Sequence, residues 1–143
     1  MAQHLTLGML KPDAIASGKA GLILAHLQKE GFVVRATRLV RLTPAQAGAF
    51  YEVHKGRPFY NDLVSFMTSG PCLPMALERV DAVSHLRGVI GATDPAEAAA
   101  GTVRKLYAES KGKNAIHASD SDENADREVA FFFAEGELAG LWG

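Results

Sequence analysis

One histidine in the chain stands at a position typical of catalysis. His117 follows the apolar pair Ala115-Ile116, which we expect to belong to a strand. It precedes Ser119 and Asp120, which we expect to begin a helix. Rigid elements hold a side chain at such a junction while it faces the open edge of the fold. A nearby carboxylate or hydroxyl would fix the imidazole tautomer and leave the other ring nitrogen free to act as a nucleophile.

Glu128 is the carboxylate whose spacing suits that task. It lies about two turns into the helix expected after Asp120, about 80–90° away from the apolar stripe at 100° per residue. From there its side chain could reach back toward His117. It could equally be a solvated flank of the helix, and spacing alone leaves both readings open.

Positive side chains occur near the expected strand ends and in a long loop. Lys11 ends the first strand, Arg87 lies on a helix, and Arg104 belongs to the loop. They suit phosphate chemistry if the fold gathers them, and otherwise they are ordinary surface charges. Phe59 follows Pro58, where core packing is the simpler reading.

Other chemical patterns are incomplete. The segment from Asp120 imitates a calcium loop, but Ala125 and Phe131 replace its turn glycine and its bidentate glutamate. Neither Gly18-Lys19 nor Gly112-Lys113 has the remaining residues of a phosphate-binding P-loop. The single cysteine, Cys72, forbids an internal disulfide and is typical of a reducing compartment.

Hydrophobic periodicity and caps predict the elements that must position these residues. We expect strands at 5–10, 32–42, 72–77 and 114–117, and helices at 20–30, 44–51, 58–67, 81–89, 102–107 and after 120. Thr43 and Gln46 form a capping box. Pro74 predicts a bulge or a strand end. The stretch 91–114 is a long loop of the kind that is usually functional.

This order predicts an α+β sandwich with helices on one face of a mainly antiparallel sheet. The 143 residues are enough for one domain, 1–143, with a core that needs neither metal nor disulfides. The net charge of −1 excludes a broad basic surface for nucleic acid. No apolar run is long enough to cross a membrane. Residues 1–4 lack the features of a signal peptide, so we expect a cytoplasmic location.

Six segments in order carry a family resemblance. Beyond the pattern Asn114-x-x-His117 followed by Ser119-Asp120, five further segments match; they begin at Lys11, Arg57, Phe66, Gly91 and Gly101. The chain resembles a nucleoside diphosphate kinase along nearly its whole length. The resemblance implies a ferredoxin-like βαββαβ sandwich, with a four-stranded antiparallel sheet, helices packed on it, and a nucleotide-binding loop at 91–114.

The resemblance also implies an activity and a set of site residues. The γ-phosphate of a nucleoside triphosphate passes to a nucleoside diphosphate through a phosphohistidine at His117, in a ping-pong reaction with low base selectivity. Glu128 orients the ring, assisted by Ser119. The family's pattern further assigns positions around the phosphates, the ribose and the nucleophile to Lys11, Tyr51, Arg87, Thr93, Arg104 and Asn114, and base stacking to Phe59.

The implied cofactor is Mg²⁺, bound mainly through the nucleotide phosphates with no metal-ligating side chains of its own. The implied assembly is a homo-oligomer, with a tetramer favoured and a hexamer or dimer as alternatives. The outer strand 32–42 independently needs a cover for its edge. The rival function is a nucleotide-binding regulatory module on the same fold without turnover, because fold alone does not fix activity.

Four positions depart from the family pattern: Asp94, Leu106, Lys111 and Ala118. Ala118 replaces a glycine, and an alanine in the left-handed region costs about 1–2 kcal/mol. We therefore expect a negative φ at residue 118.

Overall fold

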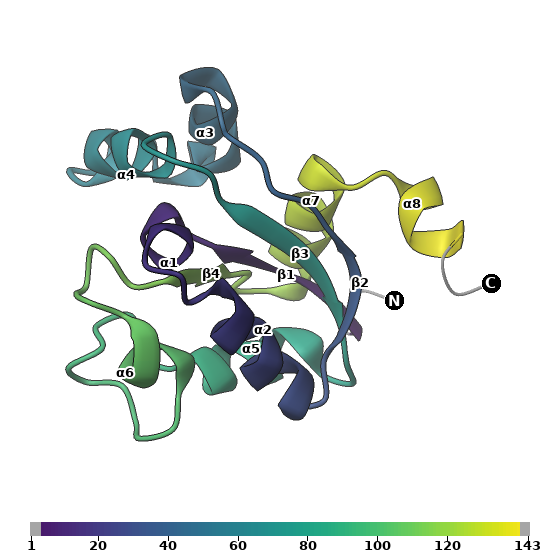
Figure 1. The fold of residues 1–143 in the computed structure, drawn as a ribbon. Coiled ribbons are helices and arrows are strands. Elements are labelled where there is room, and N and C mark those ends of the chain that lie inside the picture. Colours follow the sequence, from purple (N-terminus) through teal and green to yellow (C-terminus); the bar gives the residue numbers. More distant parts are fainter. Residues whose placement is uncertain (1–3, 141–143) are drawn as a thin grey trace.

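A computed structural model describes residues 4–140 (Figure 1). The strands are β1 Leu5–Leu10, β2 Val33–Thr37, β3 Leu73–Glu78 and β4 Ile116–Ala118. The helices are α1 Pro12–Ala16, α2 Ala20–Lys29, α3 Pro44–Phe50, the 3-10 helix η2 Glu52–His54, α4 Tyr60–Met67, α5 Ala82–Ile90, α6 Val103–Tyr107, α7 Asp122–Phe132 and α8 Glu135–Gly140. None of these helices is long and apolar enough to cross a membrane.

The strands form one antiparallel sheet in the order β2-β3-β1-β4. This confirms the ferredoxin-like α+β sandwich. The central strand β1 pairs with β3 along its whole length and with β4 over Gly8–Leu10. Because β4 lies beside β1, residues that follow β1 meet residues that follow β4, although about a hundred positions separate them in the chain.

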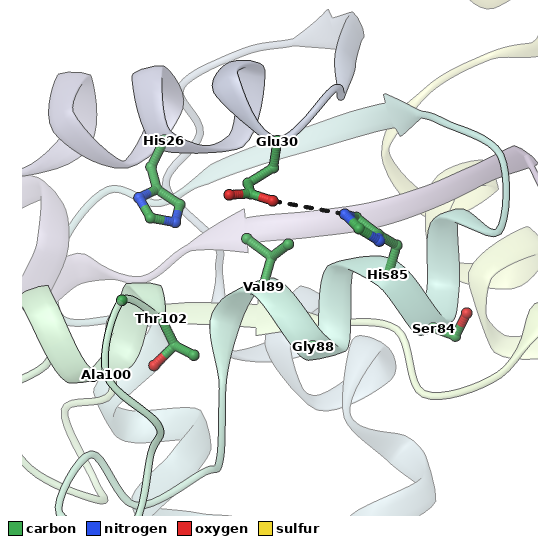
Figure 2. A pocket seen from close by; sticks show the side chains of 9 residues that line it. His26, Glu30, Ser84, His85, Gly88, Val89, Ala100 and Thr102 are labelled. Carbon is green, nitrogen blue, oxygen red and sulfur yellow. Dashed lines mark ion pairs between the residues drawn. The ribbon is translucent and has the colours of Figure 1, made fainter.

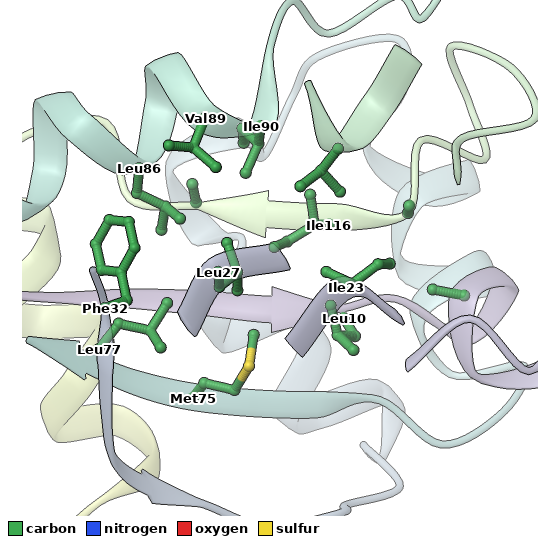
Figure 3. Close-up of a cluster of buried hydrophobic side chains, with 14 of the residues drawn as sticks. Leu10, Ile23, Leu27, Phe32, Met75, Leu77, Leu86, Val89, Ile90 and Ile116 are labelled. Atoms are coloured by element: carbon green, nitrogen blue, oxygen red, sulfur yellow. The ribbon is translucent and has the colours of Figure 1, made fainter. Parts of the chain in front are cut away.

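Helices cover both faces of the sheet, so the expected single covered face was wrong (Figure 1). One core packs Leu10 and Leu77 of the sheet against Ile23 and Leu27 of α2 and Leu86 of α5 (Figure 3). The physical reason lies in β1, which is apolar at nearly every position and therefore needs cover on both sides.

The second core lies on the opposite face of the sheet. Alternate residues of β1, Leu7 and Met9, pack there against Phe50 of α3 and Val129 of α7. In β4, Ile116 and Ala118 belong to the first core. The side chain between them, His117, therefore projects toward the face covered by α3 and α7.

Most expected elements are present with shifted ends. The capping box of Thr43 and Gln46 is confirmed, with both hydrogen bonds formed. Helix α4 begins at Tyr60 rather than Pro58, because Arg57–Tyr60 forms a turn first. Helix α7 is capped by Ser121 and not by Asp120.

The β2–β3 ladder shows how Pro74 is accommodated. The ladder stops at Thr37–Met75, directly before the proline, and resumes only as an isolated bridge between Val40 and Cys72. Because the ladder has already ended before Pro74, β2 needs no backbone N–H from the proline, and no bulge occurs there. The bulge lies instead in β2, between Val34 and Ala36. The strand expected at 32–42 is accordingly only Val33–Thr37.

Gly91 joins α5 to the long loop. Its φ of +88° and ψ of −178° lie in a region that is essentially restricted to glycine. A Cβ added there would meet Thr102 Oγ1 at 2.6 Å. Thr102 in turn caps α6 by accepting a hydrogen bond from the N–H of Lys105, so this glycine lets the two ends of the loop approach each other.

We expect Gly91→Ala to lower the free energy of unfolding by about 2–5 kcal/mol, since backbone strain and the clash with Thr102 add. Gly101→Ala separates the two causes, because φ is +84° there but no atom lies within 4 Å of the added Cβ. It should cost about 1–2 kcal/mol. Urea denaturation measures both. Equal losses in the two variants would show that contact with Thr102 is unimportant.

Candidate active site

The site is built around a hydrogen-bonded group of three side chains. His117 Nε2 lies 2.7 Å from Glu128 Oε1, and Ser119 Oγ donates to the same oxygen at 2.7 Å. β4 supplies the histidine, α7 supplies the carboxylate, and Ser119 lies between them in the chain. Glu128 is buried, so the solvated-flank reading of this residue is wrong.

This arrangement fixes the imidazole tautomer. An ionised carboxylate only accepts hydrogen bonds, so Nε2 must carry the proton in its contact with Glu128. Nδ1 then holds the lone pair and is the nitrogen available for attack. Edge-on contacts to Phe50 and Tyr51, with ring centroids 5.2 and 5.9 Å from the imidazole, restrict the ring further.

A second network surrounds Lys11. Its Nζ donates to Asn114 Oδ1 at 2.8 Å, and the amide nitrogen of Asn114 donates to the Thr93 carbonyl at 3.2 Å. Burial, together with the nearby charge of Arg104, lowers the pKa of Lys11 to about 8, while Asp13 acts in the opposite direction. The amine is thus close to losing its charge just above neutral pH.

Arg104 ties the long loop to the strand that carries His117. Its guanidinium donates to the carbonyls of Gly91, Asn114 and Ile116 at 3.1, 3.3 and 2.6 Å. Burial, together with the charge of Arg87, lowers its pKa to about 10. Arg87 itself donates to the Ala118 carbonyl at 3.5 Å. Two arginines therefore donate to carbonyls of β4, and the charge of Arg104 also acts on Lys11.

Aromatic rings extend from the histidine to the surface. Tyr51 stacks on His54, with centroids 6.3 Å apart, and His54 contacts Phe59 at 5.2 Å. Phe59 is 47% exposed, whereas the Tyr51 hydroxyl is buried with no hydrogen-bond partner among residues 4–140. Burial raises the pKa of Tyr51, so it stays protonated. Tyr51 therefore keeps an O–H donor available.

The fold thus brings together most of the residues singled out in the sequence. His117, Glu128 and Ser119 are hydrogen-bonded together, and Lys11, Asn114 and Thr93 are hydrogen-bonded beside them. Phe59 stands apart at the outer end of the rings. Phe50, which packs against the imidazole, was missed, since an apolar residue near a helix end reads as core.

The departures from the family pattern leave these contacts in place. Ala118 is absent from the described non-glycine residues with positive φ, which confirms the expected conformation. Leu106 and Lys111 are exposed. Asp94 accepts a hydrogen bond from the backbone of Ala96, so it shapes the loop locally.

His117 lines neither of two cavities, of about 350 and 470 Å³, in the described structure. One of about 350 Å³ lies between α2, α5 and residues 100–102, where Glu30 and His85 approach within 3.8 Å (Figure 2). Within residues 4–140 no three carboxylate, imidazole or thiol groups are arranged to hold a metal ion.

Comparisons with known proteins agree with this geometry. The family model described as nucleoside diphosphate kinase matches residues 4–138. The chain is 57% identical to a nucleoside diphosphate kinase of Chlorobaculum parvum, over 93% of this chain and 95% of the relative. A relative of the same name from Sorangium cellulosum is 54% identical, over 97% and 96% of the two chains.

Solved structures are similar over the same span. The crystal structure of the nucleoside diphosphate kinase of Aquifex aeolicus has a TM-score of 0.92 at 46% identity and covers 94% of this chain and 98% of its own. The Halobacterium salinarum enzyme, solved in complex with CDP, has a TM-score of 0.90 at 38% identity, covering 95% and 91%.

The burial of Lys11 gives a pH prediction. We expect its amine to titrate near pH 8, so that its reactivity toward acetic anhydride rises through that pH. The exposed Lys105 serves as the reference lysine. Competitive labelling read by mass spectrometry compares the two in one sample. Identical profiles would mean that Lys11 is solvated as an exposed lysine is.

Proposed function

The chain belongs to the nucleoside diphosphate kinase family, whose enzymes move phosphate between nucleotides, and we propose that its phosphate carrier is His117. A nucleoside triphosphate phosphorylates the ring, and a nucleoside diphosphate then removes the phosphate in a ping-pong reaction. The observation that carries the proposal is the 2.7 Å contact between His117 Nε2 and Glu128, which leaves Nδ1 with its lone pair.

In the first half-reaction the Nδ1 lone pair attacks the γ-phosphorus. A P–N bond forms while the bond between the γ-phosphorus and its bridging oxygen to the β-phosphate breaks. That oxygen takes the electron pair, and a nucleoside diphosphate leaves. The second half-reaction reverses these changes on another nucleoside diphosphate. Glu128 stabilises the positive charge that develops on the ring.

The cations and donors around β4 provide the electrostatic part of catalysis. Lys11, Arg87 and Arg104 are placed to stabilise charge on the transferring oxygens. The carbonyls that hold Arg104 keep it in place before substrate arrives, so little reorganisation is needed during transfer. Asn114, Thr93 and Tyr51 are suited to bind phosphate and ribose hydroxyl groups.

Magnesium fits this site as a companion of the nucleotide. Glu128 accepts from His117 and Ser119, and one oxygen of Asp13 accepts from the N–H of Ala115. No three carboxylate, imidazole or thiol groups of the described residues are arranged to hold a metal ion. Phosphate oxygens and water are therefore the expected ligands, as Mg²⁺ prefers. When bound, the ion would neutralise part of the charge on the β- and γ-phosphates.

We expect low base selectivity because the contacts proposed for the base are stacking and apolar ones. Phe59 offers one exposed ring face, and stacking tolerates every base. Lys111, exposed on the long loop, can lay its aliphatic stem along the opposite side of the base while its ammonium stays in water. The CDP complex of the Halobacterium salinarum enzyme is consistent with a nucleoside diphosphate as ligand.

We propose a homo-oligomer assembled through β2, with a tetramer favoured over a hexamer or a dimer. β2 is the edge strand of the described sheet, and Val33 within it and Leu39 beyond it are 39% and 60% exposed. Strand pairing with a second copy would cover this edge. We further propose that residues 1–143 act as one domain in the cytoplasm, supported by the shared sheet and the free, buried thiol of Cys72.

The first prediction of this proposal concerns the phosphoenzyme. With γ-labelled ATP the protein should take label on His117 and release it to GDP, and the label should be acid-labile and alkali-stable. His117→Ala should abolish transfer while still binding nucleotide, because the base, ribose and phosphate contacts remain.

Glu128→Gln separates orientation from charge in the same assay. The amide oxygen still accepts from Nε2, so transfer should slow by between about 10- and 1000-fold without disappearing. Asp126→Asn on an exposed position of α7 is the matched control. Transfer by His117→Ala, or label on Ser119 or Ser121 during turnover, would overturn the mechanism. A binding module without turnover would take no label.

Base stacking predicts the effect of Phe59→Ala. Nucleotide affinity should fall by about 1–3 kcal/mol for adenine, guanine and cytosine nucleotides alike. Calorimetry on His117→Ala protein measures binding without turnover, and Leu22→Ala, which removes another exposed apolar side chain, is the control. An unchanged affinity for all three nucleotides would exclude stacking on Phe59.

Oligomerisation is measured directly by light scattering. The mass at micromolar concentration should be a multiple of the 15.3 kDa chain. Val33→Lys should lower it, because a charge at the pairing edge opposes strand association. Val53→Lys, at another exposed position, should leave it unchanged. A monomeric parent protein would contradict the proposed assembly.

A further inference from the structure

The backbone just before His117 makes an unusual turn. Ala115 has a φ of +74°, and the N–H of Ile116 donates to the carbonyl of Asn114 at 2.9 Å. Together these define a γ-turn of the rare, strained kind with positive φ. Ala115 is fully buried. A left-handed alanine persists only where its surroundings impose it.

The surroundings that impose it come from the start of the chain. Asp13 Oδ2 accepts the N–H of Ala115 at 3.0 Å, and the N–H of Lys11 donates to the Ala115 carbonyl at 2.8 Å. The peptide groups on both sides of Ala115 are thereby bound by one short segment. Asp13 lies in the first turn of α1, whose backbone hydrogen bonds fix its direction.

The turn is the point where the cationic network meets the nucleophile. Asn114, on one side of Ala115, binds the Lys11 ammonium. Arg104 donates to the carbonyls of Asn114 and Ile116, which flank Ala115. His117 follows Ile116 directly. A shift of this turn would therefore move the phosphate-binding cations and the attacking nitrogen relative to each other.

We propose that Asp13 is a positioning residue for phosphate transfer, which holds Ala115 in its left-handed conformation and so sets His117 against Lys11 and Arg104. The inference rests on the proposed phosphohistidine function. Asp13 has a second contribution through charge. Its other oxygen, Oδ1, is buried without a hydrogen-bond partner in the described chain. The carboxylate favours the ammonium form of Lys11, against burial and Arg104.

The test is the single-turnover rate of His117 phosphorylation by γ-labelled ATP, with the final amount of label measured in the same quenched samples. Asp13→Ala should slow the rate constant by about 10- to 100-fold while each folded chain still takes one phosphate. A purely structural role would reduce the amount of label and leave the rate constant unchanged. Asp122→Ala, which removes an exposed carboxylate from the first turn of α7, is the control.

Two further variants identify the physical cause. Asp13→Asn keeps an oxygen for the Ala115 N–H, so it should retain most of the rate at pH 7. Because it loses the charge that opposes Arg104 beside Lys11, the alkaline fall of kcat/KM should begin at lower pH than in the parent protein. In an Ala115→Gly background Asp13→Ala should slow phosphorylation less, because glycine adopts positive φ without the penalty that alanine meets.

The outcomes separate this inference from the function on which it rests. If the parent protein takes no label on His117, the proposed function fails. If the parent is labelled but Asp13→Ala and Asp13→Asn keep its rate constant and pH profile, the positioning role of Asp13 fails alone. If Asp13→Ala does not fold, Asp13→Asn decides alone, and an unshifted alkaline limb of kcat/KM in that variant overturns the role.

Discussion

The site depends on two buried cations that have no carboxylate ion pair among the described residues. Lys11 and Arg104 are each less than one-tenth exposed, and their hydrogen bonds go to an amide oxygen and to backbone carbonyls. Neutral dipoles only partly replace lost hydration, which is why both pKa values fall. On the proposed function, a triphosphate would supply the missing negative charge, so the free protein would be electrostatically incomplete until its substrate binds.

The same electrostatic argument explains why Glu128 contacts His117 and not Lys11. If Glu128 were paired with Lys11 it would cancel the charge that attracts phosphate. It is instead held on the other side of the imidazole by Ser119 and by its place on α7. The negative group therefore faces the nitrogen that carries a proton, and the other ring nitrogen keeps its lone pair.

Local signals made much of the fold predictable. The apolar run 5–10, the capping box at Thr43 and the stripe of α2 each specify one element through interactions within a few residues. The short helix α1 was missed, because its five residues carry no readable periodicity. The apolar sequence of β1 indicates that both faces of the sheet need a cover. Which helices provide it depends on contacts between segments far apart in the chain.

The candidate site likewise has one part that the local sequence predicts and another that depends on contacts between distant segments. His117 and Glu128 share one strand–helix junction, so their spacing pointed to a pair. The contact of Lys11 with Asn114 joins positions 103 residues apart, and only the pairing of β1 with β4 creates it. From residue types alone Lys11, Arg87 and Arg104 could not be distinguished from surface charges. Only the resemblance to the family assigned them to the site. Nothing in the sequence marks Ala115 as left-handed, since alanine ordinarily avoids that region.

The sheet order also has a consequence for how the protein is made. Since β1 is the first strand synthesised and β4 the last, the centre of the sheet stays unpaired on one side until almost the whole chain has left the ribosome. Contacts so distant in sequence form slowly, because a long loop must close before they bring any stabilisation. An incomplete chain therefore carries Lys11 and Asp13 but no nucleophile to set against them. On the proposed mechanism, catalytic competence would arise only when synthesis has passed α7, so phosphate transfer would report that β4 and α7 have joined the segment that carries Lys11.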